Sequence, residues 1–216
     1  MKQSLVISSI QEGNSLRINR KDGRRAASIV AVGFVLTTIV FILFMTINGA
    51  SGVSAIVSIL ILILAALGLF GSATGLFLLR SRDLLTSQAR NGFVLQGIGL
   101  AGLFFAVILA ASSSSFTAFL VSAVVLAASA AFTFAGAILT KGGFAKTHSP
   151  RTSNVNLLLF GMILLFFGAA LIIGFNILAV TYYLSNVDAI IFEDIGATAS
   201  AYGCVLGSYS ILRLFR

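Results

Sequence analysis

Residues 53–79 read VSAIVSILILILAALGLFGSATGLFLL and contain no charged side chain. An α-helix needs about 20 consecutive apolar residues to cross the hydrocarbon core of a bilayer, and this segment is longer than that. Residues 26–47 form a second uncharged run of the same character. The apolar part of a signal peptide covers only about 7 to 15 residues. We therefore interpret both runs as membrane spans.

The composition of the whole chain agrees with this interpretation. Hydrophobic residues make up 58% of the sequence, charged residues make up 9%, and the mean hydropathy is +1.08. A soluble domain carries about 25% charged residues, so this chain has too few of them to cover a water-facing surface. We expect the lipid bilayer to surround it.

Six spans are expected from the distribution of apolar residues along the chain. They cover residues 26–47, 53–79, 93–111, 116–139, 157–180 and 195–212. The loops at 48–52 and 112–115 are short and uncharged, whereas the loop at 181–194 is longer and acidic. The predicted fold class is an all-α integral membrane protein, a six-span transmembrane helical bundle.

Every basic residue falls on one face of the predicted membrane. The basic residues are Lys2, Arg17, Arg20, Lys21, Arg24, Arg25, Arg80, Arg82, Arg90, Lys141, Lys146, Arg151, Arg213 and Arg216. Because Lys and Arg are enriched in cytoplasmic loops, we expect both termini in the cytoplasm and the loops at 48–52, 112–115 and 181–194 outside. The net charge of +8 follows this topology, which argues against nucleic-acid binding.

The N-terminal segment, residues 1–25, is predicted to be a cytoplasmic element ahead of a membrane domain at residues 26–216. Two β-prone runs, at 4–10 and 16–19, flank the turn-like cluster Glu12-Gly13-Asn14. This pattern favours a short β-hairpin. An ordered but irregular segment is the alternative.

The membrane domain shows signs of an internal repeat. Gly33, Gly97 and Gly161 are evenly spaced, and each lies several residues into an odd-numbered span. The even-numbered spans each carry small residues near their end and then meet a basic residue. This pattern predicts three helical hairpins of the same orientation. The alternative is chance, because Gly, Leu and Ala are abundant here.

Small residues recur at spacings of four in three of the spans. These residues are Gly71 and Gly75, then Ala127, Ala131 and Ala135, and then Gly203 and Gly207. Small side chains let two helix backbones approach closely, and such approach favours helix association in lipid. Each set is therefore either a contact inside this bundle or an interface with a partner subunit.

The sixth span carries the longest of these candidate interfaces. Its stripe consists of Gly196, Ser200, Gly203 and Gly207, and Tyr182 and Tyr183 adjoin it at the predicted membrane edge. The four stripe residues are three or four positions apart, so they share one helical face. We expect this surface to be the main contact with a partner. The competing interpretation packs the stripe on the fifth span of the same chain.

Residues that bind metals or cofactors are scarce in the predicted spans. The one histidine, His148, lies in a loop, and the one cysteine, Cys204, lies between two glycines as a packing residue. A metal or haem site needs several such ligands together. We expect no catalytic residue, no metal site and no cofactor, and hence no enzymatic activity.

Asn176 and Gln96 are the two large polar side chains in the predicted spans, which hold no Asp, Glu, Lys, Arg or His. Asn176 is expected to hydrogen-bond with a neighbouring helix, and the alternative is that it lines a path or coordinates a cation. Gln96 is close to the cytoplasmic edge, so its amide is expected to reach toward water.

The loop at 181–194 is the most individual segment of the sequence. Its apolar residues are interrupted by Asp188 and followed by Glu193 and Asp194. We expect a short amphipathic helix on the outer leaflet or against a partner, with Asp194 capping the last span. A cation site formed by the three acidic residues is the alternative.

These features favour a non-catalytic structural or accessory subunit, or an organiser, of a larger integral membrane protein complex. The expected partners are the lipid bilayer and either other membrane protein subunits or further copies of this chain. The alternative is a small pore or transporter for a neutral solute or ion, built from backbone carbonyls and neutral side chains such as Asn176.

Overall fold

The computed structural model describes residues 2–47, 55–80, 85–112, 115–145, 152–181 and 186–215, with side chains described from residue 22 onward except for a few beside the gaps. These residues form six helices and no strand. The helices are α1 (Lys2–Ile47), α2 (Ala55–Arg80), α3 (Ser87–Ser112), α4 (Phe116–Ala145), α5 (Thr152–Val180) and α6 (Asn186–Leu214). Each contains a segment long and apolar enough to cross a bilayer, which confirms the predicted six-span helical bundle.

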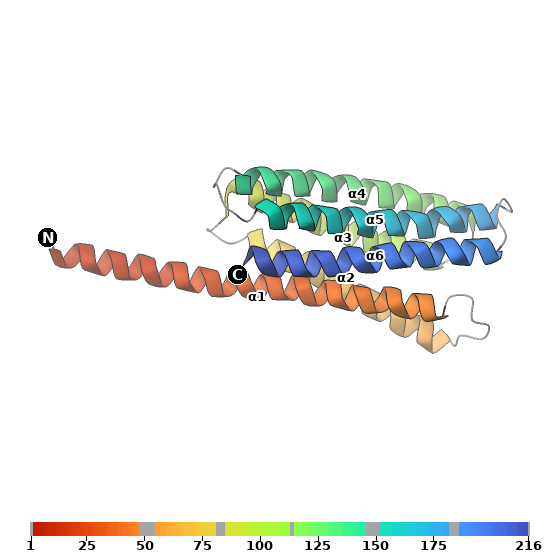
Figure 1. Ribbon diagram of the computed structural model, residues 1–216, viewed down its shortest axis with the longest axis horizontal. Helices are drawn as coiled ribbons and strands as arrows, with labels where there is room; N and C mark the ends of the chain where they lie inside the picture. The colour runs from red at the N-terminus through yellow and green to blue at the C-terminus, as the bar shows by residue number, and fades with distance from the viewer. Residues whose placement is uncertain are drawn as a thin grey trace.

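The helices form a closed ring. Each helix packs on the next one in the sequence, and α6 completes the ring by packing on α1. At that closing contact the Ser208 hydroxyl donates a hydrogen bond to the Ala31 carbonyl oxygen, over 3.4 Å. The C-terminus lies at one end of the ring (Figure 1). We call the opposite end, where α1 stops and α2 starts, the distal end.

Facing glycines join α1 to α2, α3 to α4 and α5 to α6. The facing glycines are Gly33 and Gly68, Gly92 and Gly136, and Gly161 and Gly203. A methyl group added to Gly136 would come within 2.5 Å of the Gly92 carbonyl oxygen, a distance that leaves no room for a side chain. Such seams are expected in lipid, where close backbone approach replaces the hydrophobic effect. Gly97, a member of the predicted repeat, instead faces Ala73 and Phe77 of α2.

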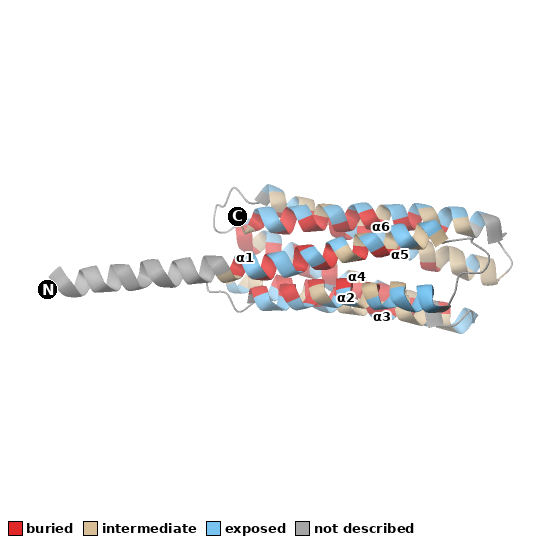
Figure 2. Ribbon diagram, turned by 90° about the horizontal axis from the view of Figure 1, so that it is seen from below, coloured by how far each residue is buried: buried red, intermediate tan, exposed pale blue. Residues whose placement is uncertain are grey.

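The outer surface of the ring is apolar on every helix. The exposed fraction is 59% for Val32, 71% for Ile56, 70% for Val124 and 65% for Ile138. Figure 2 shows exposed positions along the outward faces of the helices. Water would disfavour so much apolar surface, so these faces indicate that the ring lies in a lipid bilayer.

The predicted N-terminal β-hairpin is wrong. α1 begins at Lys2 and continues without a break to Ile47, so residues 4–10 and 16–19 are helical. Figure 1 shows this helix extending well beyond the ring. A span that is already helical adds one hydrogen bond for each residue it grows, whereas an isolated two-stranded hairpin is only marginally stable.

The predicted loops at 48–52 and 112–115 fall mostly outside the described residues. Ser112 is the last residue of α3, and Ser115 precedes α4, where its hydroxyl accepts a hydrogen bond from the Ala118 backbone N–H over 3.2 Å. This bond caps the helix, because the first N–H groups of a helix lack partners within it.

The predicted loop at 181–194 is also wrong over most of its length. α6 begins at Asn186, so Asp194 lies inside the helix and does not cap the span from outside. Apolar residues at 190–192 share their helix with the span that follows, and neither Pro nor Gly lies between residue 192 and residue 195. These residues therefore extend α6 and do not form the separate amphipathic helix that the sequence predicts on the outer leaflet.

Candidate functional site

The interior of the ring is filled at one end and hollow at the other. Most of the largest fully buried side chains, such as Phe34, Phe93, Leu158 and Leu214, lie in the half of the ring nearer the C-terminus. Figure 2 shows buried positions concentrated in that half. The distal half therefore has fewer large side chains directed inward, which leaves space between the helices.

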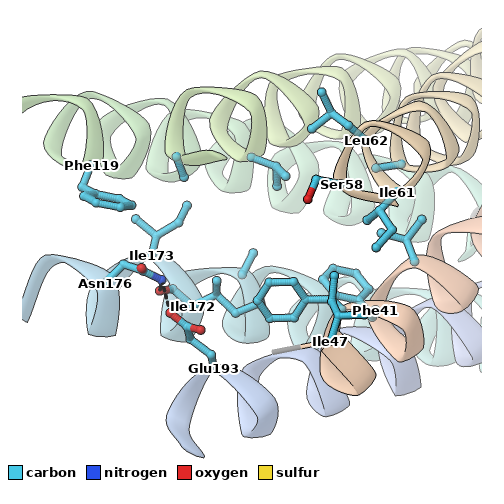
Figure 3. Close-up of a pocket in the computed structure, with 16 residues that line it drawn as sticks. Phe41, Ile47, Ser58, Ile61, Leu62, Phe119, Ile172, Ile173, Asn176 and Glu193 are labelled. Carbon is cyan, nitrogen blue, oxygen red and sulfur yellow. Dashed lines mark hydrogen bonds between the residues drawn. The ribbon is translucent and has the colours of Figure 1, made fainter. Parts of the chain in front are cut away.

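That space is a cavity of about 400 Å³. All six helices contribute to its lining, which consists of Val40, Phe41, Phe44, Ile47, Ser58, Ile61, Leu62, Ala65, Val107, Ala110, Phe119, Ala169, Ile172, Ile173, Asn176 and Glu193. We call it the six-helix cavity (Figure 3). On α1 the lining extends over residues 40–47, which corresponds to about 10 Å along a helix axis.

Two side chains, Asn176 of α5 and Glu193 of α6, form a polar wall on one side of this apolar cavity. The Asn176 side-chain nitrogen donates hydrogen bonds to the Glu193 carboxyl oxygen Oε1 and to the Ile172 carbonyl oxygen, the latter over 2.8 Å. Figure 3 shows the amide and the carboxyl group directed toward each other. Glu193 is only 8% exposed, so the bond lies within the protein and not on its surface.

Glu193 corrects the prediction that no ionisable residue lies in a span. The membrane-spanning segment of α6 covers Ile190–Leu214 and therefore includes it. Hydropathy alone predicts a span that begins at Ile195, because Glu193 and Asp194 lower the local hydropathy. A usable signal was present, since Glu193 precedes Ala197 and Ser200 by four and seven positions, and all three are buried on one helical face.

A pair of aromatic rings lies beside the polar wall. Phe175 precedes Asn176 on α5, and Phe192 precedes Glu193 on α6. Their rings are stacked, with centroids 3.9 Å apart and planes within 4° of parallel. This contact ties α5 to α6 at the level of the hydrogen bond, so it helps to keep the amide opposite the carboxyl group.

The predicted partner stripe on α6 packs inside the bundle, as the competing interpretation stated. A methyl group added to Gly196 would lie 2.6 Å from the Gly168 carbonyl oxygen of α5. The Ser200 hydroxyl donates to the Leu165 carbonyl oxygen over 3.1 Å. Gly203 faces α5 as well, and Gly207 faces the ring of Phe34 on α1. Tyr182 and Tyr183 lie outside the described residues.

The other two sets of small residues differ from each other. Gly75 faces Val30 and Ala26 of α1, and Gly71 lies beside Gly33 of the same helix. These glycines therefore belong to the α1–α2 contact. Ala127, Ala131 and Ala135 are all exposed on the outer face of α4.

Gln96 does not reach toward water, which corrects another expectation. Its side chain is fully buried, and its nitrogen donates to the Thr140 hydroxyl over 2.8 Å, which joins α3 to α4. Its oxygen Oε1 is buried without a hydrogen-bond partner among the described residues. The small residues of the α3–α4 seam draw the two backbones so close that Gln96 is enclosed, and it lies away from the six-helix cavity.

The three acidic residues of the predicted cation site are not brought together. Asp188 is exposed, Glu193 faces the cavity, and Asp194 lines a shallow outer groove with Ile191 and Thr198. Within the described part of the chain, no group of three or more His, Cys, Asp or Glu side chains is placed to hold a metal ion.

The six-helix cavity has the properties of a small-molecule binding site. Such sites are mostly apolar, with a few polar groups that fix the orientation of the ligand. An ionisable residue in a membrane span also marks a functional position in most membrane proteins, because burying it is costly. No protein-family model, curated protein or solved structure matches this chain. The function is therefore inferred from the cavity and its polar wall.

Proposed function

We propose that the protein is a small membrane transporter that takes up a solute in the six-helix cavity. The observation that carries the proposal is the cavity of about 400 Å³, lined by all six helices and polar on one wall. Its volume lies within the range of about 300 to 1,000 Å³ typical of ligand pockets. Its position at the distal end, within the membrane-spanning part of the ring, suits exchange of a solute with one side of the bilayer.

The polar wall supports transport over a purely structural role. A carboxyl group inside a membrane protein lowers stability unless nearby groups compensate, so its presence in a cavity suggests a use for it. A purely structural ring would gain from an apolar residue at position 193. The glycine seams also support the proposal, because they hold pairs of helices as units that can tilt relative to one another.

The test is uptake by proteoliposomes. The purified chain is reconstituted and offered a panel of radiolabelled small solutes that includes neutral diols, aromatic alcohols and organic ammonium ions. Ser58→Trp fills the cavity from α2, where Ser58 is exposed and has room for a larger side chain. Ile63→Trp is the matched control on the same helix, because Ile63 is 49% exposed and does not line the cavity.

At least one solute is expected to enter faster than into empty liposomes with the wild type and with Ile63→Trp, and not with Ser58→Trp. The transporter proposal is wrong if the wild-type chain accelerates no solute of the panel. It is equally wrong if Ser58→Trp transports as fast as the wild type.

A second proposal is that the protein is an accessory subunit of a larger membrane complex. The observation that favours it is the exposed stripe of Ala127, Ala131 and Ala135 on α4, where a helix of another chain can approach closely. In native membranes, Ala131→Phe is expected to release co-purifying membrane subunits, and Phe132→Leu, at an exposed position next to the stripe, is expected to retain them. Purification without any partner would contradict this second proposal.

A further inference from the structure

The charged side chains that line the six-helix cavity are of one sign. Its lining contains one acidic residue, Glu193, and none of the described lining residues is Lys, Arg or His. The basic residues that fall within the helices lie within residues 2–25 of α1, near the start of α3 and near the ends of α2, α4 and α6. All of these positions are at or beyond the end of the ring opposite the cavity. When Glu193 is ionised, the potential inside the cavity is therefore negative, and the apolar lining screens it little.

The hydrogen bonds of Asn176 determine what the polar wall offers to a solute. An amide nitrogen carries two N–H bonds, and Asn176 directs hydrogen bonds to Ile172 and to Glu193. The amide oxygen is then the group of Asn176 that is left to bind a solute. Together with the carboxylate, the wall presents hydrogen-bond acceptors, which suit a solute that donates hydrogen bonds.

The rest of the lining suits an apolar body. Phe41, Phe44 and Phe119 contribute aromatic rings, and most other lining residues are aliphatic. Figure 3 shows Phe41 and Phe119 on different sides of the cavity. Aromatic faces attract cations as well as apolar groups.

We infer that the six-helix cavity selects organic ammonium ions, in which an apolar body carries a protonated amine, and that Glu193 is their counter-charge. The apolar body lies among the aromatic and aliphatic side chains, and the ammonium group donates hydrogen bonds to the Glu193 carboxylate and the Asn176 oxygen. This inference rests on the proposed function and names its class of substrate. It adds a charge requirement that a transporter for neutral solutes would not have.

The experiment measures how well three probes of similar shape protect a cysteine in the cavity. Ser58→Cys is introduced in a Cys204→Ser background, and its reaction with uncharged methyl methanethiosulfonate is followed in lipid nanodiscs at pH 7. The probes are 2-phenylethylammonium, 2-phenylethanol and phenylacetate, which are cationic, neutral and anionic. Ile63→Cys, on the lipid-facing side of the same helix, reports effects of the probes on the bilayer alone.

The ammonium probe is expected to slow labelling of the Ser58→Cys variant at a concentration about tenfold lower than the alcohol, because one charge-assisted hydrogen bond contributes about that factor. Phenylacetate is expected to protect least. Glu193→Gln removes the advantage of the cation. Asp194→Asn, which removes the neighbouring acid outside the cavity, retains it.

The outcomes separate this inference from the proposed function. If the alcohol protects as well as the ammonium probe, the cavity binds solutes without selecting charge, and only the inference is overturned. If no probe slows labelling of the Ser58→Cys variant, solute binding itself fails and both are wrong. The comparison of the three probes in the Ser58→Cys variant that retains Glu193 tests the charge selectivity even if the Glu193→Gln variant does not fold.

Discussion

Asn176 and Glu193 form a hydrogen bond between α5 and α6 inside the membrane-spanning part of the ring. From the sequence alone, Asn176 is expected in a contact between helices and Glu193 in an outer loop. In the structure the two side chains meet because α6 begins at Asn186, about two and a half turns before the predicted span. The bond therefore serves two roles: it joins two helices, and it forms the polar wall of the six-helix cavity.

Asn176→Leu removes the amide that supports the buried carboxyl group. We expect it to lower the free energy of unfolding by about 1 to 3 kcal/mol, which is the usual cost of removing one hydrogen bond from a buried charged group. Unfolding by sodium dodecyl sulfate in mixed micelles measures the change. Asn156→Leu, at an exposed position of the same helix, is the control and is expected to have little effect. Equal stability of the Asn176→Leu variant and the wild type would contradict a role of the bond in stability.

Gly203→Ala tests the seam between α5 and α6. A methyl group at this position would come 2.5 Å from the Gly161 carbonyl oxygen, so the two helices must separate. We expect a loss of at least about 1 kcal/mol in the free energy of unfolding. Gly174→Ala is the matched control, because a methyl group there meets nothing within 4 Å. It is expected to leave stability unchanged or raise it by up to about 1 kcal/mol, since Ala favours helix more than Gly does. Opposite signs for the two variants are the result to look for.

Thr140→Val tests the buried hydrogen bond between α3 and α4. It removes the acceptor of the Gln96 side-chain N–H, and Gln96 is fully buried. The expected cost is about 1 to 3 kcal/mol of unfolding free energy. Adding Gln96→Leu is expected to recover part of that cost, because no buried amide then remains. Thr133→Val is the control, since the Thr133 hydroxyl donates only within its own helix, to the Ser129 carbonyl oxygen. A double variant less stable than Thr140→Val would rule out this explanation.

The predicted orientation, with both termini in the cytoplasm, is tested by cysteine labelling of intact cells. Ser115→Cys and Ser87→Cys are made separately in a Cys204→Ser background, and both positions are exposed at opposite ends of the ring. A membrane-impermeant maleimide is expected to label the Ser115→Cys variant from outside and the Ser87→Cys variant only after lysis. Labelling of both variants from outside would contradict the predicted orientation or show that the cells were not intact. Labelling of only the Ser87→Cys variant from outside would show the reverse orientation.

The number and type of the helices were readable from the chain alone. Residues 53–79 carry no charge over a length that can cross a bilayer, and a segment of this kind must satisfy its backbone hydrogen bonds internally, as an α-helix does. Both the length and the apolar character are local properties, so they do not depend on what packs beside the segment.

Which face of each helix is buried could not be predicted in the same way. Gly203 and Ala131 occur in similar small-residue patterns, yet Gly203 is buried against α5 and Ala131 is exposed. In a soluble helix the polar side would mark the surface, but here lipid-facing and inward-facing residues are equally apolar. Only the closing of the ring separates the two kinds of face.

The site depends most on the arrangement of the helices. Hydropathy averaged along the chain treats Glu193 and its acidic neighbour Asp194 alike, so it places Glu193 outside the predicted span. The two side chains nevertheless leave the helix in directions about 100° apart. Packing of α6 on α5 turns Glu193 inward, opposite Asn176, and turns Asp194 toward the outer groove. The cavity itself has no signal in the sequence, because it is the space that six separate helices leave unfilled when they meet.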